Sequence, residues 1–251
     1  LILLVDASEH RLYVFDPTPQ LQGLPPVLVN DYYITLGRNG LGKQKRGDNR
    51  TPLGVYTIDS ALSGDRLPDL YGAGAFPINY PNRWDQRHNR TGDGIWLHGV
   101  PSKSYSRPPL ASRGCVALAN TDFEHLGGHV TVGQTQVVIA DNVEWLPPSA
   151  HGKRRRQLLT AIERWRSDWQ SRNVKRYMSH YADDFFSADR SQNVATRGSA
   201  NSGMNRATWQ ARKAAAMSDS RSIRIDLSDI SLLGYAGETD MVEVRFQQRY
   251  R

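Results

Sequence analysis

Cysteine is almost absent from this chain: there is one, Cys115, among 251 residues. A single thiol cannot close an internal disulfide, so such cross-links do not hold the fold together. One cysteine and seven scattered histidines also lack the paired ligand spacing of zinc sites. We therefore expect neither a metal nor another cofactor. The lone thiol is then either an inert core group, the commoner case, or a reactive one.

Long hydrophobic runs are missing as well. No stretch of about 18 apolar residues occurs, so we expect no transmembrane segment. The opening run Leu1–Val5 is too short for a signal peptide, and the chain does not begin with methionine. We expect an exported protein whose signal peptide is absent from this sequence. The strand-like pattern of Met241–Arg251 ends with no further element, and we expect a C-terminal truncation there.

Positive charge is unevenly distributed. Up to Ser149 there are 13 Lys and Arg against 14 Asp and Glu, whereas from Ala150 onward there are 19 against 11. This asymmetry favours two domains with different partners. The basic residues are scattered and accompany no zinc-finger or RNP-like motif, so we expect no nucleic-acid partner. An anionic polymer such as cell wall and a simple solvated surface fit the second half equally well.

The first half has the pattern of a β-rich domain. Apolar residues alternate at Leu3 and Val5, and again at Leu12 and Val14, which predicts a hairpin turning near Ser8 to His10. Further short strands are expected around residues 32–36, 55–58, 95–97 and 130–139. Regularly spaced strands favour a β-sandwich or barrel over residues 1–145. One short helix is expected over residues 121–126, capped by Thr121 or Asn120.

Proline and glycine mark a linker over residues 146–152, and a different pattern follows it. Trp165 and Trp169 continue a helical apolar stripe, and Tyr177, Tyr181 and Phe185 form a second one. A third helix is expected around Trp209, followed by two strands near residues 223–227 and 242–246. Residues 153–251 therefore predict an α+β domain. Its aromatic stripes are more typical of a core than of a ligand pocket.

Cys115 and His98 have the chemistry of a thiol nucleophile and its general base. A histidine within roughly 3 Å of a thiol can take its proton and leave the attacking thiolate. Gly114 before Cys115 predicts a tight turn, whose backbone N–H groups could stabilise an oxyanion. Arg113 could favour the thiolate or bind a substrate carboxylate. Trp96 and Tyr105 could wall a cleft.

Three motifs carry a resemblance to a known family. They are GDNRTPLGVY at residues 47–56, IWLHG at 95–99 and SRGCVAL at 112–118. Together and in this order they resemble the L,D-transpeptidase (YkuD) catalytic domain, over about residues 1–140. The resemblance implies a β-rich fold with Cys115 as nucleophile, His98 as general base and acid, and Gly114 as the turn whose carbonyl orients the histidine. Ser112 and Gly99 are assigned with Arg113 to the substrate or oxyanion site.

Two positions depart from the usual family pattern. Many members carry histidine where Arg113 stands and arginine where Ala117 stands. This version resembles a Gram-negative branch that includes L,D-carboxypeptidases. Residues 153–251 resemble an NTF2-like domain. The pairing of both domains is similar to the cell-shape-determining L,D-carboxypeptidases of curved bacteria.

The resemblance implies a periplasmic enzyme acting on peptidoglycan stem peptides. Cys115 would form a thioester at the L-centre of meso-diaminopimelate, with release of D-alanine. Transfer to an amine then gives a 3–3 cross-link, whereas water gives a tripeptide, and the sequence leaves both outcomes open. A non-catalytic cell-wall-binding module is a further alternative. The NTF2-like domain is expected to contact cell wall or to form a homodimer.

Overall fold

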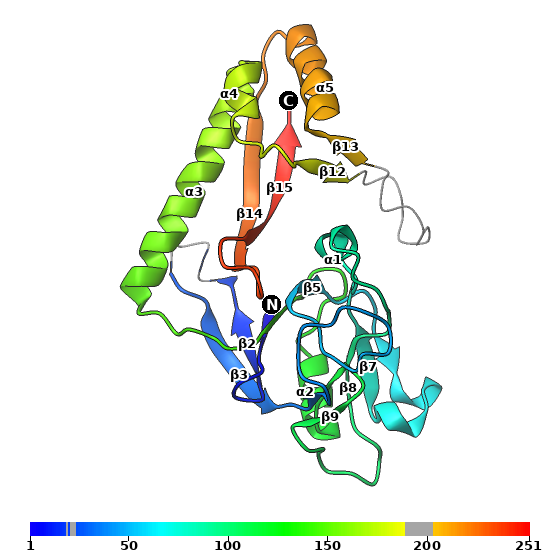
Figure 1. Ribbon diagram of the computed structural model, residues 1–251. Helices are drawn as coiled ribbons and strands as arrows, with labels where there is room; N and C mark the ends of the chain where they lie inside the picture. Colours follow the sequence, from blue (N-terminus) through cyan, green and yellow to red (C-terminus); the bar gives the residue numbers. More distant parts are fainter. Residues whose placement is uncertain (19, 21–23, 189–202) are drawn as a thin grey trace. The chain divides into compact units, whose positions relative to one another are not determined.

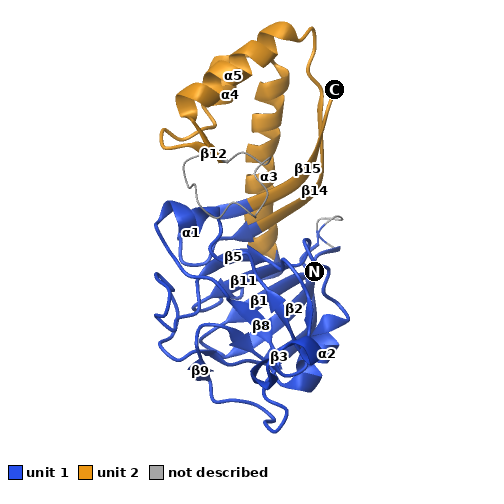
Figure 2. Ribbon diagram, turned by 90° about the vertical axis from the view of Figure 1, so that its right-hand side faces the viewer, with its two compact units in different colours: residues 1–148, 233–243 blue, residues 149–232, 244–251 orange. Residues whose placement is uncertain are grey.

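The computed structural model describes residues 1–18, 20, 24–188 and 203–251, and these fall into two units. Unit 1 consists of Leu1–Pro148 and Leu233–Glu243, and unit 2 of Ser149–Leu232 and Val244–Arg251 (Figure 2). Unit 1 therefore covers the expected first domain and adds a short segment from near the C-terminus.

A five-stranded sheet with the order β3-β2-β1-β11-β5 forms one layer of unit 1. Its strands are β1 (Ile2–Asp6), β2 (Arg11–Asp16), β3 (Val27–Tyr33), β5 (Gly54–Thr57) and β11 (Gln136–Ala140). β1 pairs antiparallel with β2, as the turn near Ser8 predicted, and parallel with β11. The alternating residues Leu3, Val5, Leu12 and Val14 are fully buried, as the period of two requires.

A second sheet, with the order β10-β8-β7-β6, carries the sequence motifs around His98 and Cys115. Its strands are β6 (Leu62–Ser63), β7 (Gly74–Pro77), β8 (Trp96–His98) and β10 (Val116–Ala117), and a separate parallel pair joins β4 (Leu36–Gly37) to β9 (Leu110–Ser112). β8 is central, since β7 pairs with it antiparallel and β10 parallel. The short helices of the unit are η2 (Gly64–Arg66), η3 (Asp69–Tyr71), α1 (Arg83–Arg87) and α2 (Asn120–Gly127).

One hydrophobic core joins these two sheets. It contains Val14 and Ile139 from the first sheet, Leu97 and Val116 from the second, and Phe123 from α2. Burying each such side chain contributes about 1.5–3 kcal/mol. The sandwich of two sheets confirms the predicted β-rich fold and holds β8 and β10 rigidly from behind.

Unit 2 is the predicted α+β domain (Figure 1). Its elements are α3 (Pro148–Gln170), α4 (Val174–Met178), α5 (Arg206–Asp219), β12 (Phe186–Ala188), β13 (Gly203–Asn205), β14 (Ile225–Gly234) and β15 (Val242–Tyr250). α3 runs alongside the β14–β15 hairpin, where Trp165 stacks near Phe246 and Trp169 near Tyr250. Among the described residues, no helix has both the length and the apolar character that a membrane span requires.

Two expected boundaries differ in the structure. α3 begins at Pro148, so residues 148–152, expected in the linker, are helical. Proline is tolerated in a first helical turn because its missing N–H would have no partner there, and one glycine costs only about 1 kcal/mol. The second aromatic stripe is not one helix, because α4 ends at Met178. Tyr181 and Phe185 still pack with ring centroids 4.7 Å apart.

The predicted side-chain cap of α2 is also wrong. The N-cap residue is Ala119, and no side chain caps the helix there. Asn120 is the first helical residue instead, and its amide makes hydrogen bonds to other segments. These hydrogen bonds join α2 to Ala73 and to Val100, which lies just after β8.

Candidate active site

Neighbouring parallel strands bring His98 and Cys115 to one face of the second sheet. Ala117 of β10 lies opposite His98 of β8, and Val116 lies opposite Leu97. Leu97 and Val116 point into the core and are fully buried. Since side chains alternate along a strand, His98 and the residue before Val116 project from the other face. The pairing of β8 with β10 therefore brings His98 and the turn that ends at Cys115 to neighbouring positions.

The turn before Cys115 is held by a glycine and a buried serine. Gly114 has φ +121°, and a Cβ there would lie 2.7 Å from the carbonyl oxygen of Arg50, so no other residue fits without strain. The hydroxyl of Ser112 accepts a hydrogen bond from the Gly114 N–H at 3.0 Å and donates to the Cys115 carbonyl at 2.6 Å. Ser112 thus fixes the turn, and the N–H of Gly114 is already engaged.

His98 is buried and carries one ring hydrogen bond. Its Nδ1 lies 2.5 Å from the carbonyl oxygen of Gly99. A carbonyl only accepts, so Nδ1 carries the proton and Nε2 keeps its lone pair. Burial lowers the pKa of His98 to about 4, assisted by the charge of Arg107, while the Gly99 hydrogen bond opposes this. The imidazole is therefore neutral at pH 7 and able to accept a proton.

The carbonyl that orients the histidine differs from the expectation. The resemblance gave this part to Gly114, but the carbonyl at Nδ1 belongs to Gly99. The reason is local: the residue that follows His98 turns its own carbonyl back to the ring, whereas Gly114 shapes the turn that carries the thiol. Gly99, expected at the substrate or oxyanion site, is buried.

Cys115 is half-buried, with its sulfur 3.3 Å from the carbonyl oxygen of Gly94. The thiol donates this hydrogen bond, which favours its protonated form. Burial raises the pKa of Cys115, while the backbone N–H of Trp96 and the charges of Lys43 and Arg107 oppose this increase. The resting pair is therefore a neutral thiol and a neutral imidazole. This environment therefore favours the protonated thiol over a preformed thiolate.

Tyr71, at the end of η3, links the site residues and was missed from the sequence. Its ring centroid lies 4.8 Å from that of Trp96 and 5.1 Å from that of His98, the latter edge-on. Burial raises the pKa of Tyr71, ionisation of Cys115 raises it further, and Arg113 lowers it. Tyr71 therefore lies beside His98 and within electrostatic reach of the thiol.

Asn120 fixes the segment that carries Tyr71 against the end of β8. Its side-chain oxygen accepts hydrogen bonds from the N–H groups of Ala73 and Val100, both at 3.0 Å, and its amide donates to the Val100 carbonyl at 2.9 Å. A Cβ at Gly99 would lie 2.2 Å from that oxygen, so only glycine fits there. No local sequence pattern identifies Asn120, because its partners lie far away in the chain.

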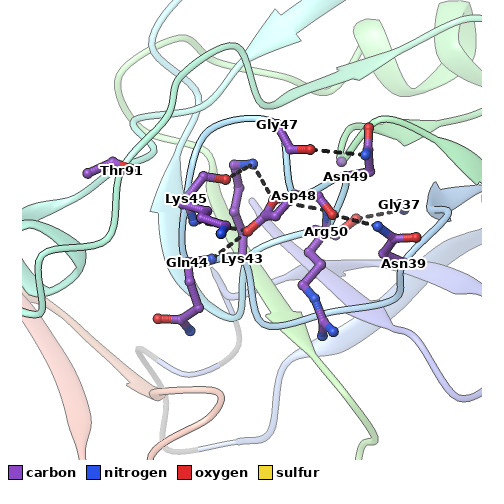
Figure 3. Close-up of polar contacts among 12 residues, drawn as sticks. Gly37, Asn39, Lys43, Gln44, Lys45, Gly47, Asp48, Asn49, Arg50 and Thr91 are labelled. Atoms are coloured by element: carbon purple, nitrogen blue, oxygen red, sulfur yellow. Dashed lines mark hydrogen bonds and ion pairs between the residues drawn. The ribbon is translucent and has the colours of Figure 1, made fainter.

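Residues 37–51 form a polar loop that is held together by hydrogen bonds and an ion pair (Figure 3). Lys43 and Asp48 form a buried ion pair of 2.7 Å, with side chains 4% and 10% exposed. Burial alone would raise the pKa of Asp48, but Lys43 and the N–H groups of Lys45, Gln44 and Arg50 lower it to about 2. The Arg38 N–H donates to the Ser112 carbonyl at 2.9 Å, which ties this loop to the turn.

The remaining expected site residues have different positions. Trp96 is partly exposed beside Tyr71, as a wall residue would be. Arg113 is exposed and lowers the pKa of Tyr71. Lys43 and Arg107 are the basic groups that lower the pKa of Cys115. Tyr105 is 86% exposed, so its ring stands in solvent rather than against the site.

The arrangement is suited to nucleophilic chemistry. It offers a thiol, a neutral histidine with a free Nε2, and a partly exposed surface for a carbonyl substrate. Among the described residues, no group of three His, Cys, Asp or Glu side chains is placed to hold a metal ion.

Comparison with known families decides which kind of protein this is. Residues 1–139 match the family model of the L,D-transpeptidase catalytic domain, YkuD. The chain belongs to this family. Residues 157–251 match a second model, the Cds6 C-terminal NTF2-like domain. Both resemblances seen in the sequence are therefore confirmed, as is the combination of a YkuD fold with an NTF2-like domain.

Solved structures with the same two-part organisation exist. The chain is similar to Bd1075 of Bdellovibrio bacteriovorus, at 30% identity and a TM-score of 0.80, over 100% of this chain and 81% of that one. It also resembles the helical cell shape determining protein Pgp2 of Campylobacter jejuni as its K307A mutant, at 22% identity and a TM-score of 0.71, over 100% and 80%. The latter likeness concerns the fold alone. Comparison with curated proteins gives no match.

Proposed function

We propose that this YkuD-family protein is a periplasmic thiol enzyme that modifies peptidoglycan stem peptides. One observation carries the proposal: neutral His98, with Nδ1 bonded to Gly99, lies on β8 beside β10, the strand that begins directly after the lone Cys115. A tetrapeptide stem ending in D-alanine is the proposed substrate. Membership of the family supports this substrate class.

The first half-reaction forms a thioester. Nε2 of His98 takes the proton of the Cys115 thiol as the sulfur attacks the carbonyl carbon at the L-centre of meso-diaminopimelate. The new C–S bond forms, and the C–N bond to D-alanine then breaks. His98 returns the proton to the leaving amine, so charge and protons balance. Because both partners start neutral, no charged pair has to be maintained before substrate arrives.

The second half-reaction depends on the acceptor. Water gives a tripeptide and free thiol, whereas the amine of another stem gives a 3–3 cross-link. The resemblance to cell-shape-determining L,D-carboxypeptidases favours water. An amine competes only if the site orients it better than solvent. Arg113, exposed near Tyr71, is a candidate for binding a substrate carboxylate.

Unit 2 is proposed to contact cell wall or a second copy of the chain. A truncation near Ser149 would test this poorly, because it would also remove Leu233–Glu243 from unit 1. Point substitutions on exposed residues of α3, such as Arg156 and Arg164, keep unit 1 whole. Sacculus pull-down with these variants, compared with wild type, tests the cell-wall role, and sedimentation tests the dimer.

The decisive experiment is mass spectrometry of tetrapeptide muropeptides after incubation with the protein. Loss of one D-alanine is the expected product, coupled dimers would identify a transpeptidase, and Cys115→Ala should yield neither. The matched control is Ser106→Ala, an exposed residue outside the site. Full turnover by Cys115→Ala would contradict the proposal. An inactive but folded wild-type protein that binds sacculi would favour the binding-module alternative.

A further inference from the structure

A turn far along the sequence is built into the unit that carries Cys115. Residues Leu233–Glu243 comprise the end of β14, the connecting turn and the start of β15, and they belong to unit 1. They also lie within the stretch that matches the NTF2-like family model.

Tyr235 anchors the turn on the outer face of the five-stranded sheet. The residue is 5% exposed and packs in a cluster with Ile2, Val55 and Val138. Its hydroxyl accepts a hydrogen bond of 2.7 Å from the side-chain amide of Asn82, and that amide also donates to the Val55 carbonyl at 3.0 Å. The turn is therefore fixed at the residue that caps α1.

Glu238 anchors the turn a second time. Its Oε1 accepts a hydrogen bond of 2.9 Å from the indole N–H of Trp84. The same carboxylate forms an ion pair of 3.6 Å with Arg90, whose side chain is 17% exposed. A partly buried pair of this kind is screened less than a surface pair. One carboxylate from the turn thus contacts both α1, at Trp84, and the segment after it, at Arg90.

Beneath these contacts lies a fully buried carboxylate. Asp85 accepts hydrogen bonds from the Asn82 N–H at 3.1 Å and the Tyr56 hydroxyl at 3.2 Å, and it pairs with Arg90 at 3.1 Å. Arg90 therefore joins Asp85 to Glu238. The two terminal nitrogens of the Arg90 guanidinium are thus held by two carboxylates, which restricts its position, although its buried Nε has no hydrogen-bond partner among the described residues.

Gly94, which lies four residues after Arg90 in the sequence, contacts the sulfur of Cys115. The Arg90 N–H donates to the Asp85 carbonyl at 2.9 Å, and the Thr91 N–H donates to the Gln44 carbonyl at 2.9 Å. Gly94, three residues further on, presents the carbonyl that accepts from the Cys115 thiol at 3.3 Å. The segment that carries this carbonyl is held at one end by Arg90 and Thr91 and at the other by the buried Ile95, whose carbonyl accepts from the Ile78 N–H at 3.1 Å.

We infer that Glu238 and Tyr235 are positioning residues for Cys115: the β14–β15 turn holds α1 and Arg90, and thereby the Gly94 carbonyl that orients the thiol. Neither residue touches the reacting atoms. The reaction thus depends on a turn that lies outside the YkuD motifs of the sequence. This inference rests on the proposed function for its effect on turnover, but not for its effect on thiol reactivity.

The test compares Glu238→Ala and Glu238→Gln with Asp240→Asn in the full-length chain. Asp240 lies on the same turn and is exposed, so its substitution removes one negative charge without breaking these contacts. Glutamine can still accept from Trp84 but loses the ion pair. The measurements are kcat and KM on tetrapeptide muropeptides, and the pH profile of Cys115 alkylation by iodoacetamide. The groups that influence the ionisation of the sulfur, namely the backbone N–H of Trp96, Lys43, Arg107 and Tyr71, are the same in every variant.

Glu238→Ala should lower kcat by about tenfold with little change in KM, because a small misplacement of reacting groups is costly. Its alkylation profile should also move to lower pH, since a displaced Gly94 carbonyl no longer favours the protonated thiol. Glu238→Gln should lie between Glu238→Ala and wild type, and Asp240→Asn should match wild type.

Unchanged kcat and alkylation in Glu238→Ala would overturn the inference. An equal effect of Asp240→Asn would also overturn it, because charge alone would then explain the change. If Glu238→Ala fails to fold, Glu238→Gln and Tyr235→Phe carry the same comparison. If even the wild type turns over no muropeptide, the proposed function fails, while the alkylation profiles still decide the inference.

Discussion

The two units bury very different side chains. Within the described part of the chain, every buried polar or charged residue lies in unit 1, including Lys43, Asp85, His98 and Ser112. The buried residues of unit 2 are apolar or aromatic, such as Trp169, Tyr177 and Ile225. Burying polar groups is costly unless each is hydrogen-bonded, whereas aromatic burial is favourable in itself.

This difference indicates that backbone positions must be defined more tightly in unit 1 than in unit 2. In unit 1 buried or partly buried polar groups fix backbone segments around the thiol: Ser112 holds the cysteine turn, Asn120 holds the Tyr71 segment, and Asp85 holds Arg90. In unit 2 the aromatic cluster provides a core. Substitutions near the thiol in unit 1 should therefore change turnover, whereas substitutions in the core of unit 2 should chiefly lower the free energy of unfolding.

The sharpest contrast is predicted for His98. His98→Ala should lower kcat/KM by about 10²–10⁴-fold, the range that general-base catalysis contributes. The control is His129→Ala, an exposed histidine of the same unit, which should retain activity. Turnover on muropeptides measures both. A His98→Ala protein with wild-type turnover would remove histidine from the mechanism.

Trp169→Ala should lower the stability of the protein without changing the reactivity of Cys115. The side chain is 8% exposed and packs near Trp165 and Tyr177. Its removal should reduce the free energy of unfolding by about 3–5 kcal/mol. Urea unfolding measures this loss, while the alkylation rate of Cys115 should stay unchanged. A large change in that rate would contradict the division of roles between the units.

Asp48→Asn should destabilise unit 1 by about 2 kcal/mol at pH 7, since each pKa unit corresponds to about 1.4 kcal/mol. The folded pKa of about 2 lies below the ordinary value of 3.8, so this stabilisation is present above pH 3.8 and disappears as the pH falls towards 2. Urea unfolding across this range should show the difference between variant and wild type shrinking.

Asp93→Asn is the matched control for that measurement. Asp93 is 44% exposed and pairs with Arg46 at the surface, so its loss should cost less than about 1 kcal/mol. Equal losses for Asp48→Asn and Asp93→Asn would mean that burial of the Lys43–Asp48 pair has no energetic consequence.

Tyr105→Ala should have the smallest effect. With 86% of the residue exposed, substitution should change the free energy of unfolding by no more than about 0.5 kcal/mol. Activity on muropeptides should also remain close to wild type. A marked rise in KM would restore the role in the cleft wall that the sequence suggested.

The sequence was informative wherever neighbours along the chain decide the structure. Alternation predicted the pairing of β1 with β2, and the glycine before Cys115 predicted the tight turn. Three short motifs were enough to indicate the family. In each case the residues that matter lie within a few positions of one another, so a local pattern records them.

Other features depend on contacts between distant residues and leave no local pattern. Tyr71 meets His98 across 27 positions of sequence, and Asn120 meets Ala73 across 47. Tyr235 meets Asn82 across 153 positions. The carbonyl partner of His98 was misassigned for another reason, since both Gly99 and Gly114 lie in motifs and only geometry separates them.

The most direct test of the account is the pH dependence of kcat/KM, which reports groups of the free enzyme. A buried His98 with a pKa of about 4 stays neutral down to that pH and accepts the thiol proton throughout. The acid limb of the profile should therefore lie near pH 4. A limb at pH 6 to 7 would mean an ordinary, solvated histidine or a preformed ion pair, and would contradict the neutral pair on which the proposed mechanism depends.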